Sequence, residues 1–239
     1  MIGCDGGRSQ VRKSMNVDFD GFTYPERFLI LSTRYDFAQH GYAITNYIAD
    51  PDEWCALFKV PGNDGQGMWR VVFPTDPDAT QEQLFDEASV QARIQGFNPK
   101  QGAYDVVHRN LYSVHQRVAS NYRDGRLMVA GDAAHIVPPT GAKGLNLAAT
   151  DVKYLSSAFI EYYQDKTEAG IDSYSERCLK RIWRGERFSW WFTQLMHRFP
   201  DDGPIGAKFQ EAELEYLLNS EAGSRTIAEN YEIGRASCR

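Results

Sequence analysis

An acidic residue stands between a predicted strand and a glycine-rich helix start. The apolar residues 127–130 predict a buried strand, and Asp132 follows it after Gly131. Beyond the rigid Pro138-Pro139 pair, the segment 141–144 carries two glycines and opens a helix. A carboxylate accepts hydrogen bonds from sugar or polyol hydroxyls, and the free N–H groups of a helix start attract anions. This order of residues indicates a site for a polyhydroxylated, anionic ligand.

Two segments together suggest a family. Residues 126–151 resemble the second flavin-contacting motif of the flavin-dependent aromatic hydroxylases, with the closest match in the 4-hydroxybenzoate 3-monooxygenase branch. Residues 2–12 resemble the Asp-Gly motif of the same family, and the two motifs occur in the expected order. The resemblance implies FAD as cofactor and NAD(P)H as electron donor. It implies hydroxylation of a small phenolic compound with O₂.

The resemblance also assigns residues to the cofactor. Asp132 would bind the ribityl chain of FAD, the helix start would face the flavin pyrimidine edge, and Asp5 would lie near the pyrophosphate. A positive helix end there would stabilise an anionic reduced flavin. Without the resemblance, Asp132 is a helix cap and Asp5 a turn residue. The assigned cofactor residues are Asp5, Gly131, Asp132, Gly144, Leu145 and Asn146.

Substrate contacts are expected beside the proline pair. The carbonyl of a proline in this turn is not engaged by a helical hydrogen bond, so it is expected to be free to accept another one. By resemblance, the Pro139 carbonyl accepts a hydrogen bond from the substrate phenol, and Thr140 lies next to it in the sequence. Lys143 is expected to be a local electrostatic helper. Tyr231 matches a family tyrosine that helps to ionise the bound phenol, although it could also be an amphipathic terminal residue. Pro139 and Tyr231 are therefore the expected catalytic residues.

The composition excludes several other classes of protein. The 239 residues are 42% hydrophobic and 24% charged, as in a soluble globular protein. The net charge is −6 without a basic block, which argues against nucleic-acid binding. There is no long apolar run or signal peptide, so a cytoplasmic location is expected. The four cysteines and five histidines lack metal spacing, and no metal is expected. A homodimer is compatible with the resemblance.

Periodicity predicts an α+β fold. An incomplete FAD-binding α/β part is interrupted by an antiparallel substrate-binding sheet and followed by a helical C-terminal part. Alternation predicts strands at 53–60 and 68–73 that form a hairpin, and further strands at 28–32 and 104–118. A capping box at Thr80 and Gln83 opens one helix through Ile94. Later helices are expected after Gly144, over about 171–199 with Pro200 as its stop, and over 208–219.

Five segments follow from these patterns. We expect a remnant of the FAD-binding domain over 1–20, the substrate sheet over 21–118, an FAD-binding segment over 119–165 and a helical region over 166–231. Residues 232–239 resemble a translated sequencing adapter and are expected to carry no function. The family's Gly-x-Gly-x-x-Gly motif does not occur, so we expect a truncated start and FAD binding that is weak or absent.

The resemblance weakens before residue 126. The family branch holds its substrate carboxylate with a Ser-x-Arg pair, which the predicted strands lack. Arg34, Lys59 or Arg70 could replace it. One hypothesis is a hybrid sequence joined near Gly131. The alternatives in function are a cofactor-free remnant without activity and a flavin oxidoreductase that inserts no oxygen.

Overall fold

The chain consists of two compact units that alternate along the sequence. The computed structural model describes all residues except 51–52, 63–64, 66, 200–202 and 232–239. Unit 1 comprises residues 1–23, 115–195 and 201–239, and unit 2 comprises residues 24–114 and 196–200. The predicted Pro200 stop, part of the connection between the predicted 53–60 and 68–73 strands, and the predicted artificial tail lie outside the described residues.

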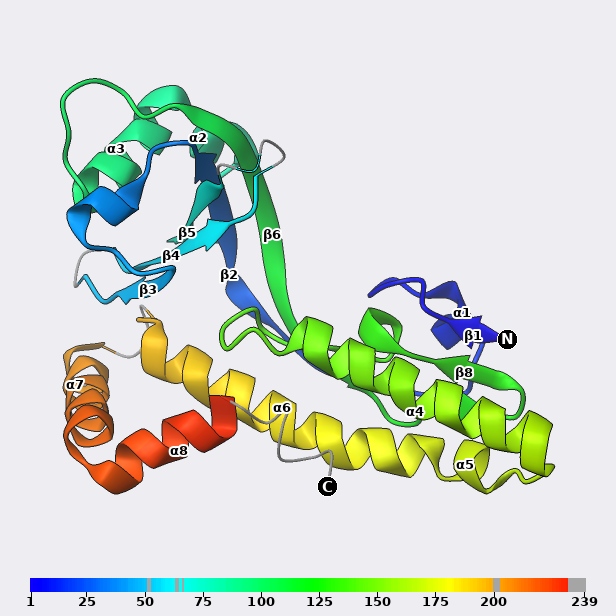
Figure 1. Cartoon of the computed structure of the whole chain (residues 1–239). Helices are drawn as coiled ribbons and strands as arrows, with labels where there is room; N and C mark the ends of the chain where they lie inside the picture. The colour runs from blue at the N-terminus through cyan, green and yellow to red at the C-terminus, as the bar shows by residue number, and fades with distance from the viewer. Residues whose placement is uncertain (51–52, 63–64, 66, 200–202, 232–239) are drawn as a thin grey trace. The chain divides into compact units, whose positions relative to one another are not determined.

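Mixed helices and strands confirm the α+β fold class (Figure 1). Unit 2 is built on an antiparallel sheet whose neighbouring strands are β3 (Thr45–Ile48), β4 (Cys55–Val60), β5 (Met68–Thr75) and part of β2 (Phe19–Thr33). The next strand in the order is β6 (Val106–Ala119), which runs back into unit 1 and ends beside β9 (His135–Ile136). The predicted 53–60 and 68–73 hairpin is confirmed by the pairing of β4 with β5.

Both faces of the unit 2 sheet are buried. Alternate β2 residues enter two apolar clusters, Leu29 and Leu31 on one face and Phe28 on the other. The first face is covered by α3 (Glu87–Phe97) through Val90 and Ile94. Alternation on β2 thus decides which cluster each side chain joins, rather than which side faces water.

The predicted helix after Thr80 is two helices. The Thr80–Gln83 capping box is present and opens α2 (Gln81–Phe85). Asp86 then adopts an extended ψ of 137°, and its side chain accepts a hydrogen bond from the Ser89 amide at 3.1 Å, which caps α3. One continuous helix was the wrong prediction, because Asp86 is a better N-cap than a helix-interior residue.

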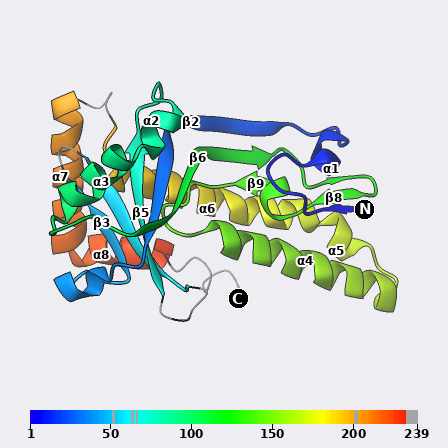
Figure 2. The ribbon, with the colours of Figure 1, turned by 90° about the horizontal axis from the view of Figure 1, so that it is seen from above.

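Unit 1 joins a small sheet to long helices. β1 (Ile2–Gly3), β8 (Leu127–Val129) and β7 (Arg123–Asp124) form a three-stranded sheet, and α1 (Gln10–Lys13) follows β1. α4 (Gly144–Asp165) and α6 (Tyr174–Met196) run side by side in both ribbon views (Figures 1 and 2). A Cβ on Gly185 of α6 would stand 2.8 Å from Leu147 of α4, so this glycine permits close packing.

The remaining helices are shorter. The predicted 171–199 helix is divided at Ser173 into α5 (Ala169–Asp172) and α6. α7 (Gly203–Asn219) is followed by α8 (Glu221–Tyr231), which lies within the predicted 166–231 helical region but was not predicted as a separate helix. Two short 3-10 helices, η1 (Phe37–His40) and η2 (Gly131–Ala133), complete the described elements. Within the described part of the chain, no helix is both long and apolar enough to cross a membrane.

Candidate functional site

Parallel pairing of β1 with β8 brings the two predicted motifs together. Ile2 is in register with Met128 and Gly3 with Val129, and the Ala130 amide donates to the Gly3 carbonyl at 3.0 Å. The residues that leave these two strands therefore emerge at the same sheet edge, as expected for parallel strands. The Cys4–Gly6 turn lies beside the Gly131–Asp132 turn, although about half of the chain separates them in sequence.

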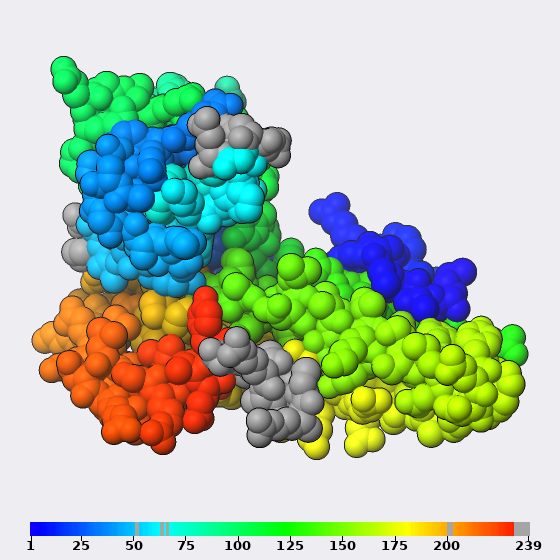
Figure 3. Space-filling model, in the orientation of Figure 1, coloured from blue at the N-terminus to red at the C-terminus, as the bar shows by residue number. Residues whose placement is uncertain are grey.

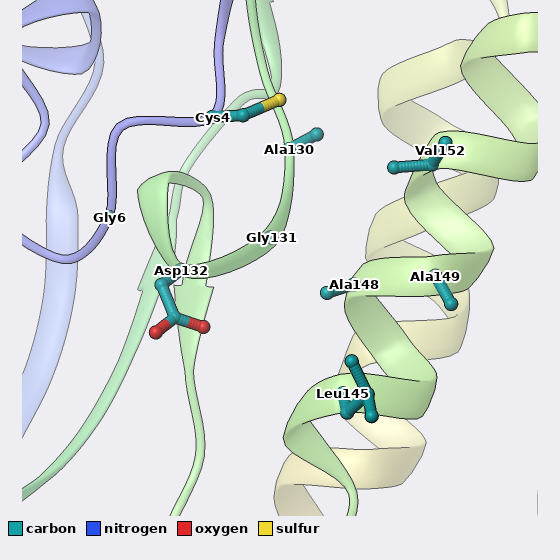
Figure 4. Close-up of a pocket in the computed structure, with 9 residues that line it drawn as sticks. All are labelled: Cys4, Gly6, Ala130, Gly131, Asp132, Leu145, Ala148, Ala149 and Val152. Atoms are coloured by element: carbon teal, nitrogen blue, oxygen red, sulfur yellow. The ribbon is translucent and has the colours of Figure 1, made fainter.

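A pocket of about 410 Å³ opens between these turns and α4. Figure 4 shows the Gly131–Asp132 turn facing the start of α4 across this space. In the space-filling view the N-terminal segment, in dark blue, borders the green surface of unit 1 (Figure 3). The pocket is lined by Cys4, Gly6, Ala130, Gly131, Asp132, Leu145, Ala148, Ala149 and Val152.

The helix wall of the pocket consists of apolar side chains that the core does not use. Leu145 is 82% exposed and Val152 is 55% exposed, whereas the opposite face of α4 is buried through Leu147 and Leu155. The apolar spacing in this segment correctly predicted a helix. It did not separate the core-facing side chains from those that line the pocket, because both stripes are apolar.

The start of α4 is open to a ligand. Its N-cap residue, Lys143, makes no side-chain capping hydrogen bond. The first-turn amides of a helix have no partner within the helix. Gly144 and Asn146 therefore present backbone N–H groups beside Leu145 of the pocket wall. Together with the helix dipole, these groups favour an electron-rich or anionic ligand edge.

The Asp132 turn is held by an arginine that the sequence patterns did not single out. Arg12 of α1 is 7% exposed, and its guanidinium donates to the carbonyls of Ala133 and Gly7, each at 2.7 Å. Burial lowers the pKa of Arg12, while the charge of Asp5 opposes this change. Arg12 thus joins the N-terminal motif to the turn that carries Asp132. The role of Arg12 could have been suspected only from its position in the 2–12 segment, which resembles the Asp-Gly motif.

Asp5 is hydrogen-bonded to the start of α1, whose N-cap residue is Ser9. Its carboxylate accepts from Ser9 Oγ at 2.5 Å and from the Gln10 amide at 2.7 Å. The Ser9 hydrogen bond is the main reason why the pKa of Asp5 is lowered. The neighbours Cys4 and Gly6 line the pocket, whereas Asp5 is not among the lining residues. These local hydrogen bonds account for the Asp5 side chain, as in the alternative interpretation of Asp5 as a turn residue, and its predicted cofactor contact stays a prediction.

The loop between β9 and α4 is a tight turn. The Ala142 amide donates to the Pro139 carbonyl at 3.0 Å, so the prediction of a free prolyl carbonyl was wrong. The turn requires positive φ angles at Gly141 (87°) and Ala142 (52°), and the second is strained for a residue with a side chain. A carbonyl oxygen has a second lone pair, which remains for another donor. Thr140 in the same loop is buried, at 4% exposure.

Lys143 and Tyr231 meet beside this loop. The Lys143 ammonium donates to the Tyr231 carbonyl and lies 5.0 Å from the Tyr231 ring centroid and 4.8 Å from that of Phe188. The Tyr231 ring also lies 6.0 Å from Phe192, with the ring planes at 74°. Burial lowers the pKa of Lys143. Tyr231 of α8 is therefore next to the predicted substrate loop, 88 positions away from Lys143 in sequence.

The described residues contain no candidate metal site, because no group of three or more His, Cys, Asp or Glu side chains among them could hold a metal ion. His135 is 1% exposed and bonded to Asp151, consistent with the structural role expected for a histidine beside a glycine loop. The described cysteines, Cys4, Cys55 and Cys178, are free thiols, and only Cys4 is exposed.

Comparison with known proteins gives one consistent result. The family model described as "FAD binding domain" matches residues 1–189. The p-hydroxybenzoate hydroxylase of Acinetobacter baylyi (strain ATCC 33305 / BD413 / ADP1) is 55% identical over 125 residues, which are 52% of this chain and 31% of that protein. The para-nitrophenol 4-monooxygenase of Pseudomonas sp. (strain WBC-3) is 35% identical over 173 residues, 72% of this chain and 42% of that protein.

Solved structures agree with the sequence matches. The p-nitrophenol 4-monooxygenase from Pseudomonas putida DLL-E4 superposes with a TM-score of 0.78 at 29% identity, over 98% of this chain and 58% of that one. A ternary complex of aklavinone-11 hydroxylase with FAD and aklavinone has a TM-score of 0.71 at 20% identity and shows the shared fold, over 85% of this chain and 38% of that one. The chain thus spans less than two thirds of the length of each of these relatives.

Proposed function

Because the chain belongs to the family of FAD binding domains found in flavin-dependent aromatic hydroxylases, we propose that its pocket holds FAD. The observation that carries the proposal is the meeting of Asp132 and the open start of α4 across one pocket, beside the Cys4–Gly6 turn. A carboxylate, unpaired helix amides and an apolar wall fit the polyol, the polar ring edge and the flat ring of a flavin. The chemistry of the lining therefore suits the family's cofactor.

Asp132 would bind the hydroxyl-bearing chain of the cofactor. Its side chain is exposed at the pocket, and Gly131 allows the turn through a positive φ of 62°. Arg12 fixes the backbone after Asp132 through the Ala133 carbonyl. A carboxylate held in this way accepts hydroxyl hydrogen bonds without first ordering its own backbone.

The start of α4 would hold the electron-rich ring edge. The backbone amides of Gly144, Leu145 and Asn146 belong to its first turn, and the helix dipole adds positive potential at that point. Both effects favour a ring that carries negative charge over a neutral ring. Leu145 and Val152 would cover the apolar surface and exclude water.

We place the substrate beside Pro139, Thr140 and Tyr231. The Pro139 carbonyl, through its second lone pair, and the Thr140 segment would orient a phenol hydroxyl. Tyr231 would help to take its proton, since an ionised phenol has a more electron-rich ring. The Lys143 ammonium between the Tyr231 and Phe188 rings would stabilise negative charge in this region.

The proposed reaction is hydroxylation of a small phenolic compound with NAD(P)H and O₂. FAD, when bound, supplies the transfer of electrons from the nicotinamide and the activation of oxygen. The names of the hydroxybenzoate and nitrophenol relatives support a small aromatic substrate. A flavin oxidoreductase that inserts no oxygen and an inactive, cofactor-free chain are the competing functions.

Titration with FAD tests the cofactor proposal. We expect weak but saturable quenching of flavin fluorescence by this chain, because it has no Gly-x-Gly-x-x-Gly phosphate loop. Asp132→Ala should weaken binding by about tenfold, as expected for loss of hydrogen bonds to a charged group. Asp165→Asn, at an exposed position of α4 far along the helix, is the control. Equal affinity of Asp132→Ala and the unchanged chain would contradict the assignment.

Oxygen uptake tests the reaction. The chain, loaded with FAD, is supplied with NADH or NADPH and with p-hydroxybenzoate or p-nitrophenol as probes. Hydroxylated product in step with oxygen uptake supports the monooxygenase. Oxidation of the nicotinamide without a hydroxylated product supports an oxidoreductase instead, and no flavin binding at all supports the inactive chain.

A further inference from the structure

Asp151 is a buried acid that touches the turn carrying Asp132. It lies in the third turn of α4 and is 2% exposed. Its Oδ2 atom accepts hydrogen bonds from the Gly131 amide at 3.0 Å and from His135 Nε2 at 2.7 Å. One carboxylate therefore holds the residue before Asp132 and the ring of a residue three positions after it.

His135 is fixed from several sides. Its backbone pairs with Val118 in the β6–β9 ladder, and its ring stacks on Tyr122 with centroids 6.2 Å apart. Carboxylate oxygens act as acceptors, which assigns the proton of this contact to His135 Nε2. Both partners are almost fully buried, at 1% and 3% side-chain exposure, where such hydrogen bonds are strong.

The position of Asp151 on α4 connects the two walls of the pocket. Its neighbour Val152 and the residue one turn earlier, Ala148, line the helix wall, whereas Gly131 and Asp132 form the opposite wall. A Cβ on Gly131 would stand 3.4 Å from the Ala148 side chain, so the walls approach closely at this point. The Asp151–Gly131 hydrogen bond is a direct link between them.

We propose that Asp151 is a positioning residue that sets the placement of Asp132 relative to α4. This inference rests on the proposed FAD site, in which both walls contact the same ligand. Asp151 does not line the pocket and touches no ligand itself. A shift of the turn away from α4 would move the Asp132 carboxylate relative to the helix amides, and both could no longer serve one rigid molecule.

The test compares Asp151→Asn with Asp165→Asn, which makes the same chemical change at an exposed position of the same helix. The first readout is the Gly131 amide, by its proton chemical shift and exchange rate. The second is FAD affinity from fluorescence titration, well below the unfolding temperature of each variant. We expect faster exchange at Gly131 and at least about tenfold weaker FAD binding for Asp151→Asn, as for loss of a hydrogen bond to a charged group. No change is expected for Asp165→Asn.

The outcomes separate positioning from simple stabilisation. If Asp151→Asn lowers the unfolding temperature but keeps FAD affinity within twofold, the residue only stabilises the fold and the proposal is wrong. If the unchanged chain binds no FAD, the proposed function fails. The amide signals of Gly131 and Asp132 then decide the inference. If these amide signals shift in Asp151→Asn and not in Asp165→Asn, the inference is supported. If they are unchanged in Asp151→Asn, it is overturned.

A second variant covers the case in which Asp151→Asn does not fold. His135→Gln keeps an N–H donor near the position of Nε2, whereas His135→Leu removes it. Better protection of the Gly131 amide in His135→Gln than in His135→Leu supports the proposal. In the unchanged chain, exchange at Gly131 as fast as in an open loop would overturn the proposal without any variant.

Discussion

Replacement of Glu186 by glutamine should change how stability depends on pH. Glu186 lies in α6 and is 2% exposed. Burial raises the pKa of Glu186 from its ordinary value of 4.5 to about 8, although an interaction with the Gln116 side chain lowers it in part. Because the folded-state pKa is the higher one, this group's contribution to stability is complete below pH 4.5 and is lost as the pH rises toward 8.

The magnitude follows from proton linkage. Between pH 4.5 and 7 the unfolded chain has released the Glu186 proton, while the folded chain keeps it. This difference costs about 1.4 kcal/mol per pH unit, or about 3 kcal/mol at pH 7. A glutamine of the same shape does not titrate, so the cost disappears in Glu186→Gln. Any constant effect of the new amide cancels when the two pH values are compared.

The assay is urea unfolding of both proteins at several pH values from 4.5 to 8, with circular dichroism as the signal that reports unfolding. Relative to the unchanged chain, Glu186→Gln should gain about 3 kcal/mol in unfolding free energy between pH 4.5 and pH 7. Glu176→Gln, at an exposed position of the same helix, is the control. A gain below about 0.5 kcal/mol would refute the reasoning, because Glu186 would then be ionised in the folded chain.

Three further predictions concern single sites. Saturating FAD should slow alkylation of Cys4, which lines the pocket, as measured by mass spectrometry of its peptide. Thr80→Ala should lower the unfolding free energy by about 1 kcal/mol, since it removes the α2 capping box, and urea unfolding measures this. Gly141→Ala should cost at least about 1 kcal/mol, because φ is 87° there and the new Cβ would stand 2.8 Å from Phe188; thermal unfolding measures this.

Each of these predictions has an internal reference. The buried Cys55 and Cys178 should react slowly with or without FAD, and an equal Cys4 rate in both conditions would place that thiol away from the bound cofactor. Thr80→Ser should retain most of the stability lost in Thr80→Ala. Gly102→Ala also has a positive φ, of 75°, but meets no atom within 4 Å. A cost at Gly141 no larger than at Gly102 would exclude the Phe188 contact as a cause.

Local patterns predicted the elements that depend on nearby residues. The β4–β5 hairpin, the Thr80 capping box and the helix after Gly144 follow from alternation, capping chemistry and helical spacing, all of which act within a few residues. The same patterns missed the break at Asp86, and they did not separate α8 from the rest of the predicted 166–231 helical region. At Asp86, an N-cap that starts a new helix competes with continuation of the preceding helix, and local sequence patterns do not show which of the two is more stable.

The sequence by itself determined the local elements of the candidate site, because the Gly131–Asp132 turn and the glycine-rich helix start form one continuous segment. Only the tertiary structure decided what surrounds them. Parallel pairing placed Cys4–Gly6 beside that turn, and packing brought Tyr231 to Lys143 and buried Asp151 under Gly131. These contacts join residues 20 to about 130 positions apart. Their partners are selected by the shape of the folded core and by the burial of charge, which no local periodicity encodes.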